Sequence, residues 1–331
     1  MNHLRQKTRR LTALKYAGRI STVVKASLSL AAVVLMSFAT VAAEPTDQRT
    51  FPSPRQAIEA LVAAVHSDGD AELLEVFGPG SETLISSGDQ VADQTGRDRF
   101  LKAFGMKNGL DMETEDRAVL IIGARDYPFP IPIVRRADSW SFDTREGMKE
   151  MIDRRIGRNE LHTIEVMQVY CDAQREYASI PRNGKGLQFA QKLKSSDGLK
   201  DGLYWPVGEN GEESPLGPLI ARAAAEGYTE GLDDDDPVSF HGYFFKILMV
   251  QGEHANGGAF DYLADGKMVL GFALVAYPAR YAASGIMTFI VNQQGVIYEK
   301  DLGEETDAIA AAMTAFDPDD SWHKYTESAE P

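Results

Sequence analysis

Residues 260–303, FDYLADGKMVLGFALVAYPARYAASGIMTFIVNQQGVIYEKDLG, decide the fold class of this chain. Short apolar runs alternate there with polar turns, a pattern typical of strands. The first two runs are separated by Asp265-Gly266, and Asp-Gly between apolar segments favours a two-residue hairpin turn. The pattern predicts an antiparallel meander with strands Tyr243–Val250, Phe260–Ala264, Lys267–Tyr277, Met287–Val291 and Val296–Lys300, followed by a helix over Thr306–Phe316.

Two helices are predicted ahead of this meander. Apolar residues at helical spacing follow Thr144, and Gly157 is expected to end that helix. Asn159 is expected to begin a second, longer helix over Glu160–Ile180, because Asn is a favoured N-cap residue. Residues 181–240 are rich in Gly, Pro, Ser and Asp, which indicates an irregular linker between this helix and the sheet.

The N-terminal half also mixes helices with a hairpin. Ser53-Pro54-Arg55-Gln56 combines a capping Ser, Pro at the first helical position and Gln three residues on, so a helix is expected to begin there. Strands are predicted over Arg117–Ile122, Ile131–Val134 and Ser139–Phe142. The predicted class is α+β: an N-terminal helical and hairpin unit over residues 44–157, then a long helix, a linker and an antiparallel sheet over residues 158–331.

The first 43 residues read as a secretory signal. The first 25 carry seven basic residues and no acidic one, and ASLSLAAVVLMSFATVAA follows as an apolar run that ends in small residues. This pattern predicts Sec-type export, cleavage near Ala43 and a periplasmic or secreted protein without a stable membrane span. An uncleaved anchor is the alternative, since the run nearly reaches the ~20 residues that a span needs.

The charge after cleavage excludes some partners. Residues 1–43 hold seven of the 34 basic residues and none of the 49 acidic ones, so the remaining chain has a net charge of −22. A body this acidic repels nucleic acid and anionic membrane surfaces, and neither is an expected partner. Cys171 is the only cysteine, so no internal disulfide forms, and its apolar helical surroundings predict a buried, unreactive thiol.

One basic island stands out in the acidic chain. Arg154, Arg155 and Arg158 are expected at a helix end, just before the predicted N-cap Asn159. Guanidinium groups beside a helix N-terminus bind carboxylates or phosphates. The same arginines also suit an ion-pair network between the two halves, and both interpretations stay open. Trp205, in the segment Tyr204-Trp205-Pro206, either lines a ligand groove or anchors an irregular loop to the core.

No metal, cofactor or catalytic motif is predicted. The run Asp233, Asp234, Asp235 and Asp236 is either a solvated loop or a calcium site, although it lacks the alternate spacing of a calcium loop. Five of the histidines (His66, His162, His241, His254 and His323) are isolated in the sequence and are expected to lie apart. Ser284-Gly285 reads as a tight turn, since no Gly-x-Ser-x-Gly nucleophile motif surrounds it.

Five long stretches carry a family resemblance: Gly271–Tyr281, Ser284–Asn292, Tyr298–Gly303, Arg154–Leu161 and Asp201–Pro206. They resemble the bacterial domain-of-unknown-function family numbered 2950. The resemblance covers essentially the whole chain after the signal and implies an exported envelope protein without assigned catalytic residues. The second half also resembles the head of type IV pilin-like proteins, although the charged region before Asn159 differs from a pilin stem. The first half distantly resembles NTF2-like cones.

These observations favour an exported envelope protein that acts by binding, without catalysis, and that supports an envelope assembly through a protein partner. A periplasmic hydrolase with a site between the two halves is one alternative. A carrier that binds a small anionic ligand at the arginines is the other. Two titratable groups within hydrogen-bond reach in a pocket would favour the hydrolase.

Overall fold

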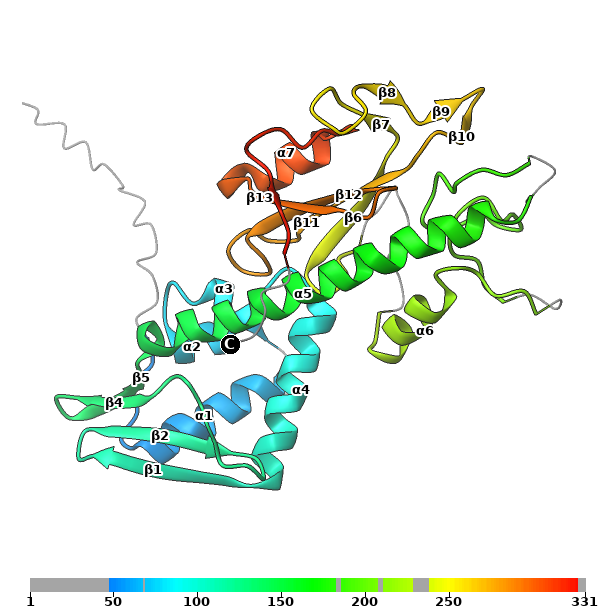
Figure 1. Cartoon of the computed structure of the whole chain (residues 1–331). Helices are drawn as coiled ribbons and strands as arrows, with labels where there is room; N and C mark the ends of the chain where they lie inside the picture. Colours follow the sequence, from blue (N-terminus) through cyan, green and yellow to red (C-terminus); the bar gives the residue numbers. More distant parts are fainter. Residues whose placement is uncertain (1–47, 68, 183–185, 208–210, 229–237, 327–331) are drawn as a thin grey trace, which may run out of the picture. The chain divides into compact units, whose positions relative to one another are not determined.

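The computed structural model describes residues 48–67, 69–182, 186–207, 211–228 and 238–326 (Figure 1). All of them belong to one unit, Ala43–Pro331. The structure combines helices with antiparallel sheets and has a long helix ahead of a strand-rich C-terminal region, so the predicted α+β class is confirmed. None of the helices in these ranges has the length and apolar character needed to cross a membrane.

Four helices and a small sheet form the N-terminal half. Ser53 caps the first helix as predicted, because its hydroxyl accepts a hydrogen bond from the Gln56 backbone N–H at 3.3 Å. The sheet order is β1-β2-β4-β5, with β3 paired to β2, and all of these pairs are antiparallel. The elements are α1 (Pro54–His66), α2 (Asp70–Phe77), α3 (Glu82–Ile85), α4 (Gln90–Met106), β1 (Asn108–Thr114), β2 (Arg117–Ile122), β3 (Tyr127–Pro128), β4 (Ile133–Arg136) and β5 (Ser139–Phe142).

A single 35-residue helix, α5 (Thr144–Ala178), replaces the two predicted helices. Gly157 does not end it, because it lacks the positive φ of a helix-ending glycine and lies within the helix. Asn159 does not cap a new helix either: it is buried, and its side-chain amide donates to the Ser284 carbonyl at 2.9 Å. The predicted boundary between residues 157 and 158 therefore falls inside α5.

The C-terminal half contains an antiparallel sheet as predicted, but the predicted strands Phe260–Ala264 and Lys267–Tyr277 do not pair along their length. Only Leu263–Ala264 and Lys267–Met268 form a short separate hairpin, and Ala273–Pro278 pairs with Tyr243–Leu248 instead. The main sheet of this half has the order β15-β13-β12-β11-β6, and every neighbouring pair in it is antiparallel. Asp265 and Gly266 form the predicted turn between β9 and β10, both with positive φ. The elements are α6 (Gly217–Ala225), β6 (Tyr243–Leu248), β7 (Val250–Gln251), β8 (Phe260–Asp261), β9 (Leu263–Ala264), β10 (Lys267–Met268), β11 (Ala273–Pro278), β12 (Met287–Asn292), β13 (Ile297–Asp301), η1 (Gly303–Glu305), α7 (Thr306–Ala312), β14 (Ala315–Phe316) and β15 (His323–Lys324).

The C-terminal helix is shorter than predicted. α7 ends at Ala312, and Ala315–Phe316 forms a strand that pairs in parallel with β7, so the small sheet β14-β7-β8 is not purely antiparallel. Phe316 is 2% exposed and packs in the C-terminal core, which explains why the chain turns from helix to strand there.

Two hydrophobic cores lie along α5. The first is built from α1, α2, α3, the strands β2, β4 and β5 and neighbouring loop residues, and Met151 of α5 packs against it. The second combines the half of α5 from Ile164 to Tyr177 with the meander and the 186–228 segment. One helix therefore contacts both cores, and residues between Met151 and Ile164 make the contacts described next.

Candidate ligand-binding cavity

A cavity of about 320 Å³ lies within the N-terminal half. Small-molecule pockets typically occupy ~300–1,000 Å³, so the space suits a small organic ligand. The walls come from α1 to α5 and from the segment around β3, and they are mostly apolar. The apolar lining includes Leu61, Val65, Leu73, Phe77, Ile85, Phe100 and Phe129.

The sequence of α4 explains why this space is not filled. Ala92, Gly96 and Phe100 are four residues apart, so they lie on one face of the helix, and all three line the cavity. Two of the three have little or no side chain. Among its 17 residues α4 has no fully buried one, in contrast to the packed face of α1. The second half of α4 packs against the core through Phe100, Leu101, Ala103 and Phe104, whereas Ala92 and Gly96 in its first half leave the apolar space open.

The structure brings the three predicted arginines to this cavity. Arg154, Arg155 and Arg158 line it together with Arg97 and one carboxylate, Asp93. The arginines lie in the middle of α5, so the prediction that they flank a helix N-terminus is wrong and no helix-end charge acts on them. Their common location follows from helical geometry, because residues one turn apart lie on the same face.

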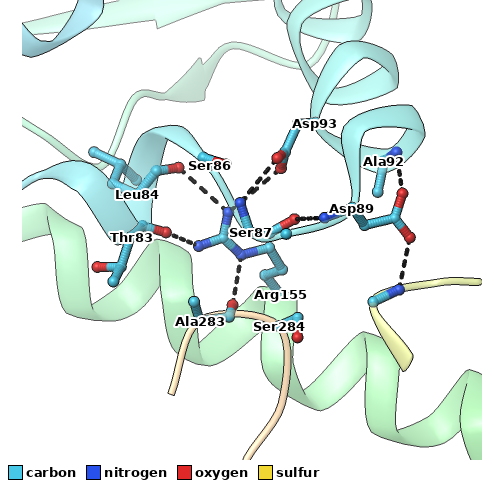
Figure 2. A network of polar contacts seen from close by, with 12 residues as sticks. Thr83, Leu84, Ser86, Ser87, Asp89, Ala92, Asp93, Arg155, Ala283 and Ser284 are labelled. Carbon is cyan, nitrogen blue, oxygen red and sulfur yellow. Dashed lines mark hydrogen bonds and ion pairs between the residues drawn. The ribbon is translucent and has the colours of Figure 1, made fainter. Parts of the chain in front are cut away.

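Arg155 is fully engaged within the protein (Figure 2). Its Nε donates to the Ala283 carbonyl at 2.9 Å, its Nη1 donates to Leu84 at 3.3 Å, and its Nη2 donates to Thr83. Asp93 lies 3.8 Å away as an ion-pair partner. Burial lowers the pKa of Arg155 despite this carboxylate. Arg155 therefore joins α3, α4 and the connection between β11 and β12.

The neighbouring side chains of α5 bind the same connection. Asn159 donates to Ser284, and one carboxylate oxygen of Glu160 accepts from the Ile286 and Met287 backbone N–H groups, each at 3.0 Å. Two of the stretches that carry the family resemblance, Arg154–Leu161 and Ser284–Asn292, thus meet in space. These hydrogen bonds give Asn159 and Glu160 a structural role.

Two other cavity arginines also have partners. The Arg154 Nη1 donates to the Tyr127 hydroxyl at 2.6 Å, and Arg154 also pairs with Glu150. Arg97 pairs with Asp70 of α2. The positive charges of these two residues are therefore offset by carboxylates within the protein.

Arg158 differs from the other three. In the described part of the chain, no hydrogen bond or ion pair joins it to another residue. Its pKa is lowered, first because nearby protein removes part of its hydration and then because Arg99 carries a like charge. Arg158 thus presents a guanidinium without a counter-charge beside an apolar cavity.

Trp205 is not part of this site. It is 4% exposed, belongs to the C-terminal core, and its indole N–H donates to the Glu212 carbonyl at 3.3 Å. The guanidinium of Arg182 lies 5.4 Å from the centre of the Trp205 ring. These contacts match the loop-anchoring interpretation.

The other predicted candidates are the aspartate run, Cys171 and Ser284. Asp233, Asp234, Asp235 and Asp236 lie outside the described residues, and within those residues no cluster of three or more His, Cys, Asp or Glu is arranged to hold a metal. Cys171 is 3% exposed, and burial raises the pKa of its thiol to about 12. The Ser284 hydroxyl accepts from the Arg280 N–H at 2.9 Å within the predicted tight turn.

His162 and His241 are not isolated, contrary to the prediction. Their ring centres are 4.5 Å apart, and the His241 Nε2 lies 3.0 Å from a carboxylate oxygen of Glu226. With Glu165, Val166 and Arg222 they line a second cavity of about 90 Å³ between α5 and α6. His241 has φ +50° and its side chain is 19% exposed. The two histidines are 79 positions apart, so only the tertiary fold reveals the pair.

Acidification is expected to destabilise the fold through His241. Burial, followed by the neighbouring His162, lowers the pKa of His241 from 6.5 to about 4. Between these pH values the unfolded chain binds a proton that the folded chain does not, so stability falls as the pH falls through this window. Relative to His241→Gln, the wild type should lose about 2 kcal/mol between pH 7.5 and pH 5. Urea unfolding of both proteins measures this difference, and parallel pH profiles would contradict it.

The chain was compared with known proteins and families. No curated protein and no solved structure matches it. The likenesses to pilin-like heads and to NTF2-like cones therefore remain predictions. One family model, described as "Protein of unknown function (DUF2950)", matches residues 48–325. Since this match spans most of the chain and confirms the resemblance seen in the sequence, the chain belongs to the DUF2950 family.

Proposed function

We propose that this protein is an exported binding protein of the bacterial cell envelope, which holds a small ligand in the cavity under α4 without transforming it. The observation that carries the proposal is the cavity itself, about 320 Å³ of mostly apolar space in an otherwise packed half. The predicted signal peptide supports export, and the strong negative charge of the chain after cleavage supports a soluble protein. The partner that this function implies is an envelope protein that delivers the ligand or receives it.

The residues of the cavity favour binding over catalysis. Its titratable groups are four arginines, Asp93 and Tyr127, whose hydroxyl accepts from Arg154, and no Ser, Thr, Cys, Lys or His lines it within the described chain. Burial raises the pKa of Asp93, yet its carboxylate already accepts from the Ser87 N–H at 2.8 Å and pairs with Arg155. A general base needs a free approach to its substrate, and Asp93 is held by the protein instead.

One observation favours the hydrolase alternative. His241 and Glu226 are two titratable groups within hydrogen-bond reach in a cavity, the arrangement expected of a general base and its orienting carboxylate. That cavity measures only about 90 Å³, well below the ~300 Å³ of small substrate sites. No Ser, Thr or Cys lines it in the described residues. The larger, apolar cavity is therefore the better-supported site.

A neutral fluorescent probe tests the proposed function. N-phenyl-1-naphthylamine is apolar and uncharged, so it reports on the cavity independently of the arginines. We expect saturable binding with one site per chain. Gly96→Leu should weaken binding by about tenfold or more, because the new side chain occupies the cavity and overpacking costs ~1–3 kcal/mol.

Gly105→Leu provides the matched control. Gly96 and Gly105 both lie in α4, and an added Cβ meets no atom within 4 Å at either position, but only Gly96 lines the cavity. Both substitutions replace a helical glycine with a good helix former and should stabilise α4 similarly, by about 0.8 kcal/mol. Equal probe affinities for the two variants, or an absence of saturable binding, would refute the proposal.

A further inference from the structure

We infer that the ligand is an amphipathic monoanion, with an apolar body inside the cavity and a single carboxylate-like head group paired with Arg158. This inference rests on the proposed small-ligand function and adds the chemical class of the ligand. The charges around the cavity determine which head group the ligand carries, and the apolar walls determine which body fits inside.

The charges around the cavity leave one place for an anion. Arg97 pairs with Asp70, Arg154 pairs with Glu150, and Arg155 pairs with Asp93 and donates to three carbonyl groups. These three arginines have their charge offset within the protein.

Arg158 is the exception among the cavity arginines. No ion pair or hydrogen bond to it exists in the ranges that the structure describes, and the residue is exposed, so its guanidinium on the cavity lining is accessible to a ligand from solvent. A bound carboxylate would pair with this cation and would accept two parallel hydrogen bonds from the planar guanidinium.

The same lining limits the ligand to one negative charge. Asp93 lies on the cavity wall beside Arg155, so a second anionic group near this wall would face a carboxylate. The other walls are aliphatic and aromatic, including Leu61, Phe77 and Phe100. A polar or charged body there would lose its hydration without gaining partners, which is unfavourable. A carboxylate on a hydrocarbon chain meets both requirements.

Octanoate and octan-1-ol test this inference on the purified chain by isothermal titration calorimetry. The two probes share a hydrocarbon chain and differ in charge. Octanoate should bind with one site per chain, and octan-1-ol about tenfold more weakly, because a charge-assisted pair is lost. Arg158→Gln should weaken octanoate binding by about tenfold and leave octan-1-ol binding unchanged. Arg145→Gln, an exposed arginine in the first turn of α5, is the control and should bind octanoate like the wild type.

The alternatives give different results. Equal affinities for both probes, or octanoate binding that is unchanged in Arg158→Gln, would overturn the monoanion while leaving the cavity as a binding site. Binding of N-phenyl-1-naphthylamine without any binding of octanoate would also overturn the monoanion and leave the cavity as a binding site. If no apolar probe binds at all, the proposed function fails together with this inference.

The acidic run Asp233–Asp236 requires a separate variant, because it lies outside the described residues. Replacing its four aspartates with asparagine should leave octanoate affinity within about threefold of the wild type, as expected when no charge near the head group changes. Octanoate binding that appears only in this variant would assign the counter-charge of Arg158 to the protein itself and overturn the inference.

Discussion

Replacing Arg155 with methionine is expected to lower the free energy of unfolding by about 3–5 kcal/mol. The Arg155 side chain is 14% exposed, and its removal leaves three carbonyl groups without their donor and Asp93 without its cation. Buried polar groups that lose their partners bear a desolvation cost that methionine cannot offset. Chemical denaturation followed by circular dichroism measures the loss.

Arg158→Met is the matched control for this experiment. The substitution is the same, the helix is the same, and the residue is one turn away, but within the described chain Arg158 has no partner to lose. Its effect on unfolding should be within about 0.5 kcal/mol of the wild type. Similar losses in both variants, or a stable Arg155→Met protein, would contradict the structural role assigned to Arg155.

Gly147→Ala is expected to destabilise the fold by about 2–3 kcal/mol. Gly147 is buried in the first turns of α5, and a Cβ there would lie 2.3 Å from the carbonyl oxygen of Pro130 and 2.5 Å from its carbonyl carbon. Both are backbone atoms, so no side-chain rotation relieves the overlap and the helix must shift. Thermal or urea unfolding of the variant measures this cost.

Gly157→Ala, in the same helix, should have the opposite effect. Nothing lies within 4 Å of a Cβ at Gly157, and alanine is favoured over glycine inside a helix by about 0.5–1 kcal/mol. The substitution also tests the continuity of α5. If a helix ended at Gly157 in a left-handed conformation, alanine there would be strained and would destabilise the protein. A gain in stability supports one helix, and a loss supports two.

Much of the C-terminal half is predictable from local sequence. The Asp265-Gly266 turn forms with φ values of +51° and +72°, as a two-residue hairpin requires, and Asp and Gly tolerate such values best. The capping residue Ser53 also behaves as its sequence motif predicts. At these positions the local sequence preference agrees with the structure, because no contact with a distant residue competes with that preference.

The helix α5 shows where local signals fail. Gly157 and Asn159 look like a stop and a start, but neither has that role in the structure. Asn159 uses its amide for the Ser284 carbonyl, 125 positions away in the sequence. Burial of apolar residues against two cores on either side of this segment keeps the helix continuous. A tertiary contact of this kind overrides capping preference and is not visible in the sequence.

The candidate site was partly predictable. Arg154, Arg155 and Arg158 stand out in the sequence as a basic island in an acidic chain, although their place inside a continuous helix is not visible there. The cavity beside them was not predicted, although α4 carries a signal for it. Ala92 and Gly96, on the same face as Phe100, place small residues where a core-facing helix normally has large ones. Five helices and the segment around β3 must pack before the space exists, so the small residues of α4 do not reveal the cavity on their own.

The most direct test of the account is a crystal structure of the protein with 8-bromooctanoate. The bromine marks the end of the hydrocarbon chain by its anomalous signal, and the electron density locates the carboxylate. The account predicts one bromine in the cavity among Leu61, Phe77 and Phe100, with the carboxylate in hydrogen-bond contact with Arg158. A bromine bound elsewhere, a carboxylate turned away from Arg158, or a cavity that stays free of ligand at saturating concentration would contradict it.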